Sequence, residues 1–487
     1  MRDQRAEVSL SISPERAYES EPVASRDFRI LVLGDFGGRG DAAALTNDLP
    51  RRVDRDDLDA HIARIAPRLH IAVDDAHVDL AFASLDDFTP DRLAARLTAL
   101  HRTSTTAPPA EPTTSAFSAH TPPPDIRRTV SGASLLDDMI DDTAGPSAGG
   151  AATSPGARST TRPARTDELS AFVERAVAPH LIRPDHEGAA RTAAHTREMT
   201  ELLRLVLHHP SVQALEATWR ALDLLVRRLD TDGALHLFLL DVPREQIATA
   251  LERLARRRDA ANAESWALAV ALHAFPDGEA GADALARVAM AAKELDAPVV
   301  VSAPNSFAGV ESVEQLDDDE RTPSPPPEVY ALIRRSQEAR FLGLTFPRVL
   351  LRQPYGRDNP CDTIDFEELD DPERHDQYLW GSGAALVALL VGEAFAERGW
   401  AIAGRMALDV GSLPYFTFRR GPETVAKSCA EMIMAERVAR HLLSRGLMPV
   451  AWIKNTDRVR LVELRSVAEP AAPLAAAWAG TPSGPSA

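Results

Sequence analysis

The sequence predicts an α/β fold with a small N-terminal α/β unit, a disordered linker, and a larger α/β body whose parallel or mixed sheet is flanked by helices. Three observations predict this class. Short apolar runs of buried-strand character alternate with segments of helical periodicity, which is typical of a parallel sheet covered by helices. The 487 residues, 44% of them hydrophobic, are sufficient for two or three packed domains. One long internal stretch is poor in large apolar residues.

Residues 26–101 are predicted to form the small α/β unit. Phe28-Arg-Ile-Leu-Val-Leu33 has the character of a buried strand and runs into a glycine-rich turn at residues 34–40. Residues 69–73 and 78–82 are predicted as two further short strands.

Two helices are predicted in the same unit. The first follows Asp54 as a capping residue and carries Leu58, Ile62 and Ile65 on one face, spaced four and three positions apart. The second starts at Thr89-Pro-Asp91, where a capping hydroxyl, a proline that needs no N–H partner and an acid near the positive end of the helix dipole follow one another.

Residues 102–165 are predicted to be a disordered linker, because they hold too few large apolar side chains to offset the entropy of ordering. Residues 134–142 are the exception and predict a short amphipathic helix with acids opposite an apolar face. That face consists of Leu135, Leu136, Met139 and Ile140. An isolated helix of this kind indicates a docking peptide, and packing of the helix onto its own protein is the alternative.

Residues 166–466 are predicted to form the larger body, in two parts at 166–320 and 340–466. Helical patterns dominate to about residue 228, and strands then alternate with helices, which predicts a parallel sheet with helices packed on it. The predicted strands are residues 235–240, 266–272 and 299–302, and the helices between them are residues 244–257 and 281–295.

The C-terminal part is predicted to contain a buried helix at residues 384–398 and a long helix at residues 423–445 that ends before Gly446. Residues 450–454 and 460–465 are predicted to form a hairpin that turns on Asn455-Thr-Asp457. Residues 467–487, rich in Pro, Ala and Gly, are predicted to be a flexible tail.

Charge and cysteine content limit the function classes. The net charge of −18 argues against a general nucleic-acid or acidic-membrane binder, since phosphate contact needs a basic field. Cys361 and Cys429 cannot form a disulfide framework, and the first residues lack the apolar core of a signal peptide. The most apolar run, residues 384–395, is well short of the roughly 20 residues that span a bilayer. We therefore expect a cytoplasmic protein without direct membrane insertion.

The glycine-rich turn is the first candidate for chemistry. Gly37-Gly-Arg-Gly40 follows a strand and could cradle phosphate through backbone N–H groups, and Asp35-Phe-Gly37 matches the metal-binding tripeptide of protein kinases. The sequence has no Gly-Lys-Ser/Thr ending, no Gly-x-Gly-x-x-Gly spacing and no His-Arg-Asp catalytic loop. A tight turn is favoured over a phosphate site.

The remaining candidates each have a structural explanation. His208-His209 precedes Pro210 at a helix boundary without a metal-ligand set, which favours capping or packing. His375-Asp376 could orient a base, but Ser382 lacks the spacing of a nucleophile elbow. Cys361 is either a nucleophile or a buried thiol, and the second is the ordinary case. We predict no catalytic residue, no metal site and no cofactor.

The segment between Arg340 and Trp380 is the most informative part of the chain. It interleaves arginines and large apolar residues with turn residues, as in Leu350-Leu-Arg-Gln-Pro-Tyr-Gly-Arg357 and His375-Asp-Gln-Tyr-Leu-Trp380, without a catalytic pattern. Such rings and guanidinium groups need a precise folded surround, which is typical of an assembly module.

This segment, together with Leu207-His-His-Pro210 and Leu215-Glu-Ala-Thr-Trp-Arg-Ala-Leu222, resembles the large subunit of the contractile sheath of the type VI secretion system. The resemblance covers both parts of the larger body. Residues 26–101 resemble the small sheath subunit, through residues 28–36 and Leu85-Asp-Asp-Phe-Thr-Pro90. Two subunits that are usually separate look fused here, which would fix their ratio at one to one.

The resemblance implies a bacterial structural protein rather than an enzyme. Such a protein self-assembles into a sheath around an inner tube, is attached to a baseplate, and contracts to drive effector delivery. In that family a recycling AAA+ unfoldase recognises an N-terminal helix of the large subunit. The resemblance therefore implies that Leu135, Leu136, Met139 and Ile140 form a contact face for the unfoldase.

Two other interpretations stay open. The family's large subunit normally continues past the position of the 450–465 hairpin with a further domain and a terminal segment for strand exchange between protomers. In the second interpretation, the chain is a shortened paralogue that acts as a cap, baseplate adaptor or assembly regulator. The third interpretation, from another class, is a nucleotide-dependent enzyme that uses the turn at residues 34–40.

Overall fold

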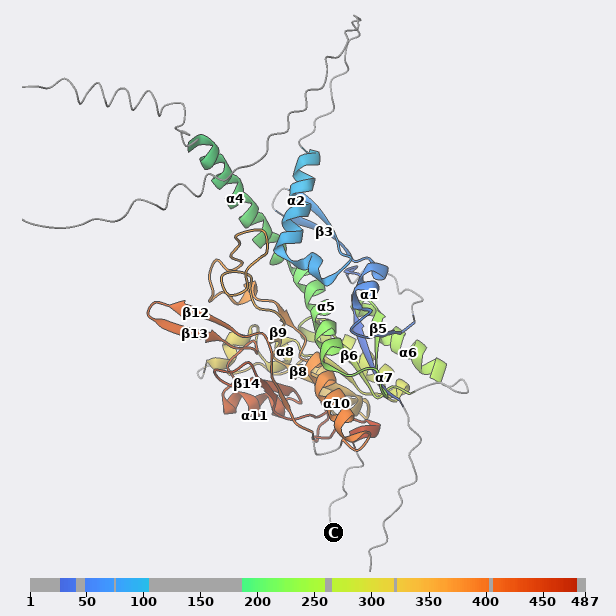
Figure 1. The fold of residues 1–487 in the computed structure, drawn as a ribbon. Helices are drawn as coiled ribbons and strands as arrows, with labels where there is room; N and C mark the ends of the chain where they lie inside the picture. Colours follow the sequence, from blue (N-terminus) through green and yellow to red (C-terminus); the bar gives the residue numbers. More distant parts are fainter. Residues whose placement is uncertain are drawn as a thin grey trace, which may run out of the picture. The chain divides into compact units, whose positions relative to one another are not determined.

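The computed structural model describes most of the chain outside one long internal segment (Figure 1). Residues 105–165 of the predicted linker, with the predicted helix that carries Leu135, Leu136, Met139 and Ile140, lie outside the described residues, whereas residues 102–104 belong to the helix Pro90–Ser104. Residues 27–101 and 196–479 belong to one compact unit; the second unit, residues 102–195, is described only at its two ends. The described ranges are 27–40, 49–73, 76–104, 186–258, 265–318, 322–402 and 406–479.

A nine-stranded sheet forms the centre of the larger unit, with strand order β11-β15-β14-β8-β7-β6-β1-β5-β2. Its middle strands run parallel, while β2 and the pairs β14–β15 and β15–β11 at the edges are antiparallel. This arrangement confirms the predicted α/β class with a parallel or mixed sheet. The strands are β1 (Phe28–Gly34), β2 (Arg51–Val53), β5 (Leu235–Asp241), β6 (Leu268–Ala271), β7 (Val299–Ser302), β8 (Leu342–Phe346), β11 (Asp409–Val410), β14 (Met448–Trp452) and β15 (Val459–Leu461).

Strand β1 lies between β5 and β6, so the N-terminal region and the later region share one sheet. Phe28 to Gly34 pair in register with Leu235 to Asp241 on one side, and Ile30 pairs with Leu268 on the other. A central strand whose two faces are both covered is a nearly continuous run of apolar residues in the sequence, and β1 has this character. The domain boundary placed at residue 101 stays a prediction, but the sheet itself crosses it.

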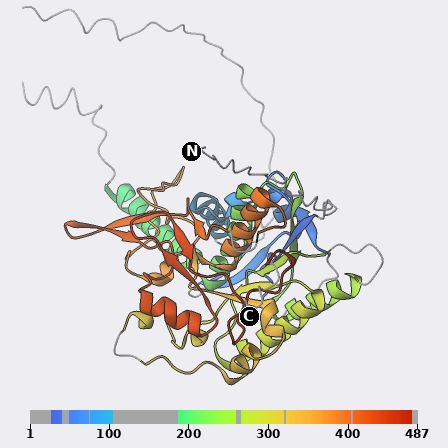
Figure 2. The ribbon, with the colours of Figure 1, turned by 90° about the horizontal axis from the view of Figure 1, so that it is seen from below.

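Helices cover both faces of the sheet, and β1 shows how its side chains divide between them. Ile30 and Val32 pack with α5 (Pro210–Arg228) and α10 (Ala384–Arg398), whereas Leu31 and Leu33 pack with α6 (Ile247–Arg258) and α7 (Gly278–Leu295). Figure 2 shows α6 and α7, in yellow-green, away from the orange α10. Because successive strand residues point to opposite faces, one apolar run serves two cores.

Smaller elements complete the unit. The hairpin β3–β4 alternates exposed and buried residues along β3, and its buried side chains join the core that contains α5. The remaining elements are α1 (Leu58–Ile65), β3 (Arg68–Val73), β4 (Ala76–Ala81), η1 (Leu85–Phe88), α2 (Pro90–Ser104), α4 (His186–Leu207), η2 (Arg244–Gln246), α8 (Asn305–Ala308), η3 (Val313–Asp317), α9 (Glu328–Arg334), η4 (Glu338–Phe341), β9 (Val349–Leu350), η5 (His375–Gln377), β10 (Trp380–Gly381), β12 (Phe416–Arg420), β13 (Glu423–Lys427), α11 (Glu436–Ser444) and η6 (Ala477–Ala479).

The predicted helix at residues 423–445 is wrong over its first half. Residues 423–427 form strand β13, which pairs with β12 across a turn at Gly421, where φ is +60°. Residues 428–431 then run along β9, with Leu350 N donating to Cys429 O at 2.8 Å. The sequence signal is local: Thr424 and Val425 are β-branched and favour an extended strand. The helix starts only at Glu436.

The predicted flexible tail is wrong for residues 467–479. Val467, Leu474 and Trp478 are buried at 0%, 2% and 3% exposure. The indole Nε1 of Trp478 donates to Ala267 O at 2.8 Å, next to strand β6. Residues 467–479 have a composition with low propensity for helix or strand, but burial of a few large side chains orders them nonetheless. Residues 480–487 lie outside the described part of the chain.

Most other predicted elements are confirmed, including the strands before and after α6, the buried helix α10 that ends at Gly399, and the hairpin that turns at Asn455. Within the described ranges, every helix is too short or too polar to cross a membrane.

Candidate functional site

The segment between Arg340 and Trp380 is anchored to the body by a buried ion network. The Arg352 guanidinium lies between two carboxylates: Nε donates to Glu216 Oε1 at 2.8 Å, and Nη1 donates to Glu368 Oε2 at 2.6 Å. All three side chains are buried, Glu216 completely. Arg220 adds a second cation to Glu216, and the ring of Tyr355 stacks against the guanidinium of Arg352 at 4.5 Å. The network therefore ties helix α5 to the loop that follows β9.

Burial and charge act in opposite directions on Glu368. Burial alone would raise the pKa of this carboxyl, but the Arg352 charge and the hydrogen bonds to it, including one from Tyr355 N at 2.8 Å, lower the pKa to about 2. His208 Nε2 lies 3.6 Å from the same carboxylate. The neighbour His209 caps α5, with its Nδ1 accepting from Ser211 N at 3.2 Å, so the capping interpretation of the two histidines is confirmed for His209.

A second buried carboxylate, Glu431, holds the other end of the segment. It accepts hydrogen bonds from Arg348 Nε and from His375 Nε2, both at 2.9 Å. Burial would raise the pKa of Glu431, but these partners lower it to about 2. The His375 ring stacks on Trp380 with centroids 4.8 Å apart, and Trp380 Nε1 donates back to His375 O at 2.9 Å. His375 is thus engaged in anchoring.

A third anchor joins the N-terminal region to the same segment. Asp91, in the first turn of α2, accepts hydrogen bonds from Asp362 N at 2.9 Å and from Thr363 N at 2.8 Å. Burial opposes ionisation of Asp91, but the Thr363 hydroxyl and these amides hold its pKa below the usual value. The residue that the sequence marks as a helix-start acid therefore binds a loop more than 250 positions away.

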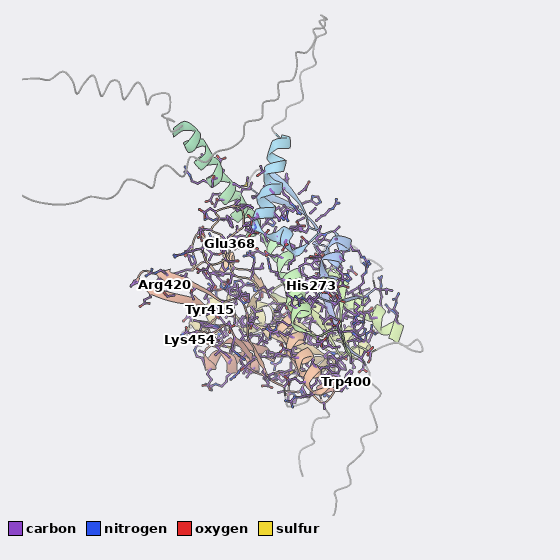
Figure 3. The ribbon with its side chains drawn as sticks, viewed as in Figure 1. His273, Glu368, Trp400, Tyr415, Arg420 and Lys454 are labelled. Carbon is purple, nitrogen blue, oxygen red and sulfur yellow. The ribbon has the colours of Figure 1, made fainter. Side chains whose placement is uncertain are left out.

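The β12–β13 hairpin projects from this segment. Figure 1 shows it reaching away from the sheet, and Figure 3 places Arg420 towards its outer end and Tyr415 nearer the body. At its base Phe416 meets the ring of Tyr378, and Lys427 lies 4.3 Å above that ring. The residues of the hairpin near its turn are exposed. Among the described residues, no third strand pairs with it.

The geometry gives the chemical candidates structural roles. Ser382 Oγ lies 3.0 Å from Ser302 Oγ, while His375 faces Glu431, so His375 and Ser382 do not form a nucleophile pair. Burial, and then the charge of Asp91, raises the pKa of Cys361 to about 11, which keeps it a thiol at neutral pH. The described residues contain no group of three or more His, Cys, Asp or Glu side chains placed to hold a metal ion.

The glycine-rich turn uses its own carboxylates. Gly37 N donates to Asp241 Oδ1 at 3.1 Å, and Asp35 accepts from Arg39 N at 3.0 Å and from Gly40 N at 2.7 Å. Gly38 N donates to Asp35 O. Because these four amides are already engaged, the turn offers no free cradle of backbone N–H groups to a phosphate.

Sequence reasoning missed Glu216 and Glu431 as anchors. Glu216 had a detectable signal, because it stands beside Leu215 and three positions before Trp219 on the apolar face of a helix, where an acid is expected only with a buried cation. Glu431 had none, since its partners Arg348 and His375 are 83 and 56 positions away.

Two protein families match this chain. Residues 191–468 match the family described as "EvpB/VC_A0108, tail sheath N-terminal domain" (VipB). Residues 2–105 match the family described as "Type VI secretion system, VipA, VC_A0107 or Hcp2". The chain is also similar to the "Type VI secretion system sheath protein TssC1" of Pseudomonas aeruginosa strain PAO1, with 25% identity over 303 residues. That match covers 57% of this chain and 61% of the relative.

Proposed function

Because the chain belongs to the VipB family of type VI secretion tail sheath proteins and also carries a VipA-type segment, we propose that it polymerises around an inner tube and contracts to drive effector delivery. The observation that carries this proposal is the position of β1. A strand from the VipA-matched segment is hydrogen-bonded between two strands of the VipB-matched segment. The two matched segments therefore act as one rigid protomer, and the Asp91 contacts to residues 362 and 363 add a second tie.

Strand addition between protomers is proposed at the β12–β13 hairpin. The edges of the nine-stranded sheet are the very short strands β11 and β2, of two and three residues, and short edges discourage strand addition. The hairpin instead offers two strands of five residues each whose outer edges have no partner among the described residues. Main-chain hydrogen bonds at such an edge bind another chain without requiring a pocket.

Contraction requires protomers that keep their shape while their contacts change. The buried networks around Arg352 and Glu431 fit this demand, since each fixes a loop by several charge-assisted hydrogen bonds. Work would come from many modest contacts between protomers that are repeated along the polymer. We further propose the inner tube protein and the baseplate as partners, the face of Leu135, Leu136, Met139 and Ile140 as the contact for the recycling unfoldase, and the cytoplasm as the location.

Negative-stain images of the purified full chain, alone and mixed with the inner tube protein, test the proposal. Tubes are expected. Small particles under every condition would contradict polymerisation and favour the shortened paralogue that acts as a cap, baseplate adaptor or regulator. Purification of the tagged protein from cells should recover inner tube protein and unfoldase.

A nucleotide-dependent enzyme is the alternative from another class. We expect no heat of binding and no hydrolysis when ATP or GTP is added to the protein, because the amides of the turn at residues 37–40 are engaged by Asp35 and Asp241. Saturable heat followed by phosphate release would favour the enzyme.

A further inference from the structure

The carboxyl ends of β1 and β5 open into a basic pocket of about 840 Å³. Four arginines contribute to its lining, against a single aspartate, Asp241, which already pairs with Arg39 at 2.9 Å. Leu49, Ile65 and Leu69 provide an apolar wall. The arginines are Arg39, Arg51, Arg64 and Arg68. In a chain with a net charge of −18, such a pocket is a local reversal of the overall charge.

Arg64 and Arg68 are the exposed cations of this pocket, and neither forms an ion pair with another described residue. A guanidinium presents a fork of donors that fits carboxylate or phosphate oxygens. The backbone amides that usually grip phosphate at a glycine turn are engaged by Asp35 and Asp241. The mixture of guanidinium groups and apolar wall therefore suits an acidic chain segment better than a free phosphate.

The same protein displays an acidic surface on the loop between residues 357 and 376. Eight exposed carboxylates lie on it against two exposed arginines, Arg357 and Arg374. The three anchors described above hold this loop to α5, α2 and Glu431, so its charges are presented on a fixed backbone. The acids are Asp358, Asp362, Asp365, Glu367, Asp370, Asp371, Glu373 and Asp376. Of these, Asp358 and Asp365 form no side-chain hydrogen bond or ion pair with another described residue.

Helix α5 separates the two surfaces. Ser211 lines the basic pocket. Two positions further on, Gln213 Nε2 donates to Asp376 O at 3.0 Å and so contacts the acidic loop. Two positions correspond to about 200° around a helix. On the same side of α5 as Gln213, Glu216 and Arg220 contact Arg352 and Tyr355, and these two residues in turn bind Glu368 of the loop. The pocket and the loop therefore face away from each other in one copy of the chain.

We infer that the basic pocket of one copy binds the acidic loop, residues 357–376, of a second copy. Two different patches on opposite sides of the protomer make a heterologous contact, which propagates into a ring or an open polymer instead of closing as a two-fold dimer. The inference rests on the proposed self-assembly and adds the pair of surfaces that meet. Opposite charges on the two surfaces also select the head-to-tail orientation, since like surfaces repel.

Charge reversal of the full-length protein tests the inference. R64E/R68E makes the pocket acidic, and D358R/D365R reverses the two loop carboxylates that have no partner among the described residues, which leaves six exposed carboxylates against four arginines on the loop. Each variant alone should raise the protein concentration needed for half-maximal assembly by about tenfold or more, measured by light scattering and sedimentation, because like charges then meet at the reversed positions. An equimolar mixture of the two variants should assemble again, because the reversed positions of one pocket then meet the reversed positions of one loop, and the unaltered pocket meets the unaltered loop.

Matched controls change the same charge elsewhere. R253E/R257E on α6 and D283R/E294R on α7 reverse exposed residues away from both surfaces, and they should leave wild-type assembly unchanged. Circular dichroism confirms folding of each variant, and the milder R64Q/R68Q replaces any reversal that fails to fold.

The outcomes separate the inference from the proposed function. Wild-type protein that assembles while both reversals have no effect, or while their mixture does not recover, overturns the inference and leaves the proposed function standing. Wild-type protein that never assembles overturns both. Inorganic tripolyphosphate that binds wild type but not R64E/R68E, with assembly unaffected by the reversals, would make the pocket a phosphate site and also overturn the inference.

Discussion

Replacing Arg352 by methionine should destabilise the protein strongly at neutral pH. The substitution removes the cation between Glu216 and Glu368, whose side chains are 0% and 1% exposed, and leaves two buried carboxylates without it. Removing one partner of a buried ion pair costs about 3–5 kcal/mol. The pKa of Glu368 gives a similar size, since a drop from 4.5 to about 2 corresponds to about 3 kcal/mol of preference for the charged form in the folded state.

The pH dependence of the loss has a defined sign. In the wild type the pKa of Glu368 is lower in the folded than in the unfolded state, so its stabilisation is present above pH 4.5 and disappears as the pH falls towards 2. In R352M, burial without the cation raises the pKa of the carboxyl, and protonation on acidification relieves the cost. The difference in unfolding free energy between the two proteins should therefore shrink to less than half between pH 7 and pH 4.

Urea unfolding followed by circular dichroism at pH 7 and pH 4 measures both effects. R357M is the matched control, because Arg357 is exposed on the same loop and should change stability by less than about 0.5 kcal/mol. An apolar replacement of the whole triad, E216L/R352M/E368L, should recover most of the lost stability. A loss below about 1 kcal/mol for R352M at pH 7, or a loss that grows on acidification, would refute the reasoning.

Three further predictions follow from the packing. E431Q should lower the free energy of unfolding by about 1–3 kcal/mol at pH 7 and by progressively less below pH 4.5, because the partners of Glu431 lower its pKa to about 2. An unchanged urea midpoint at pH 7 would contradict this. W478A should cost about 3–5 kcal/mol if the buried Trp478 packs beside β6, whereas a flexible segment would give no change in the thermal midpoint. V32D places a carboxylate in strand β1, which lies between β5 and β6, and burying that charge should destabilise both neighbouring strands. Limited proteolysis should therefore cut the variant in both the VipA-matched and the VipB-matched segments. Cleavage confined to the first 105 residues would argue that the two segments fold separately.

Local patterns predicted most elements but not their partners. The run from Phe28 to Leu33 indicated a buried strand, yet nothing in its own residues indicated that the strands beside it begin at Leu235 and Leu268. The helix predicted over residues 423–445 failed where β-branched residues around Gly421 pair across a turn. The segment after residue 466 failed because burial of Trp478 outweighs a composition typical of a tail.

The sequence by itself determined the α/β class, the family and the importance of the segment between Arg340 and Trp380, because periodicity and short motifs are local properties. Only the tertiary structure decided that β1 completes a sheet built mainly from later residues, that Glu216 and Glu431 neutralise Arg352 and Arg348, and that basic and acidic surfaces lie on opposite sides of α5. These features depend on contacts between residues far apart in the chain. Such contacts are selected by the burial of apolar faces and the pairing of buried charges, and both are settled only when the whole unit packs.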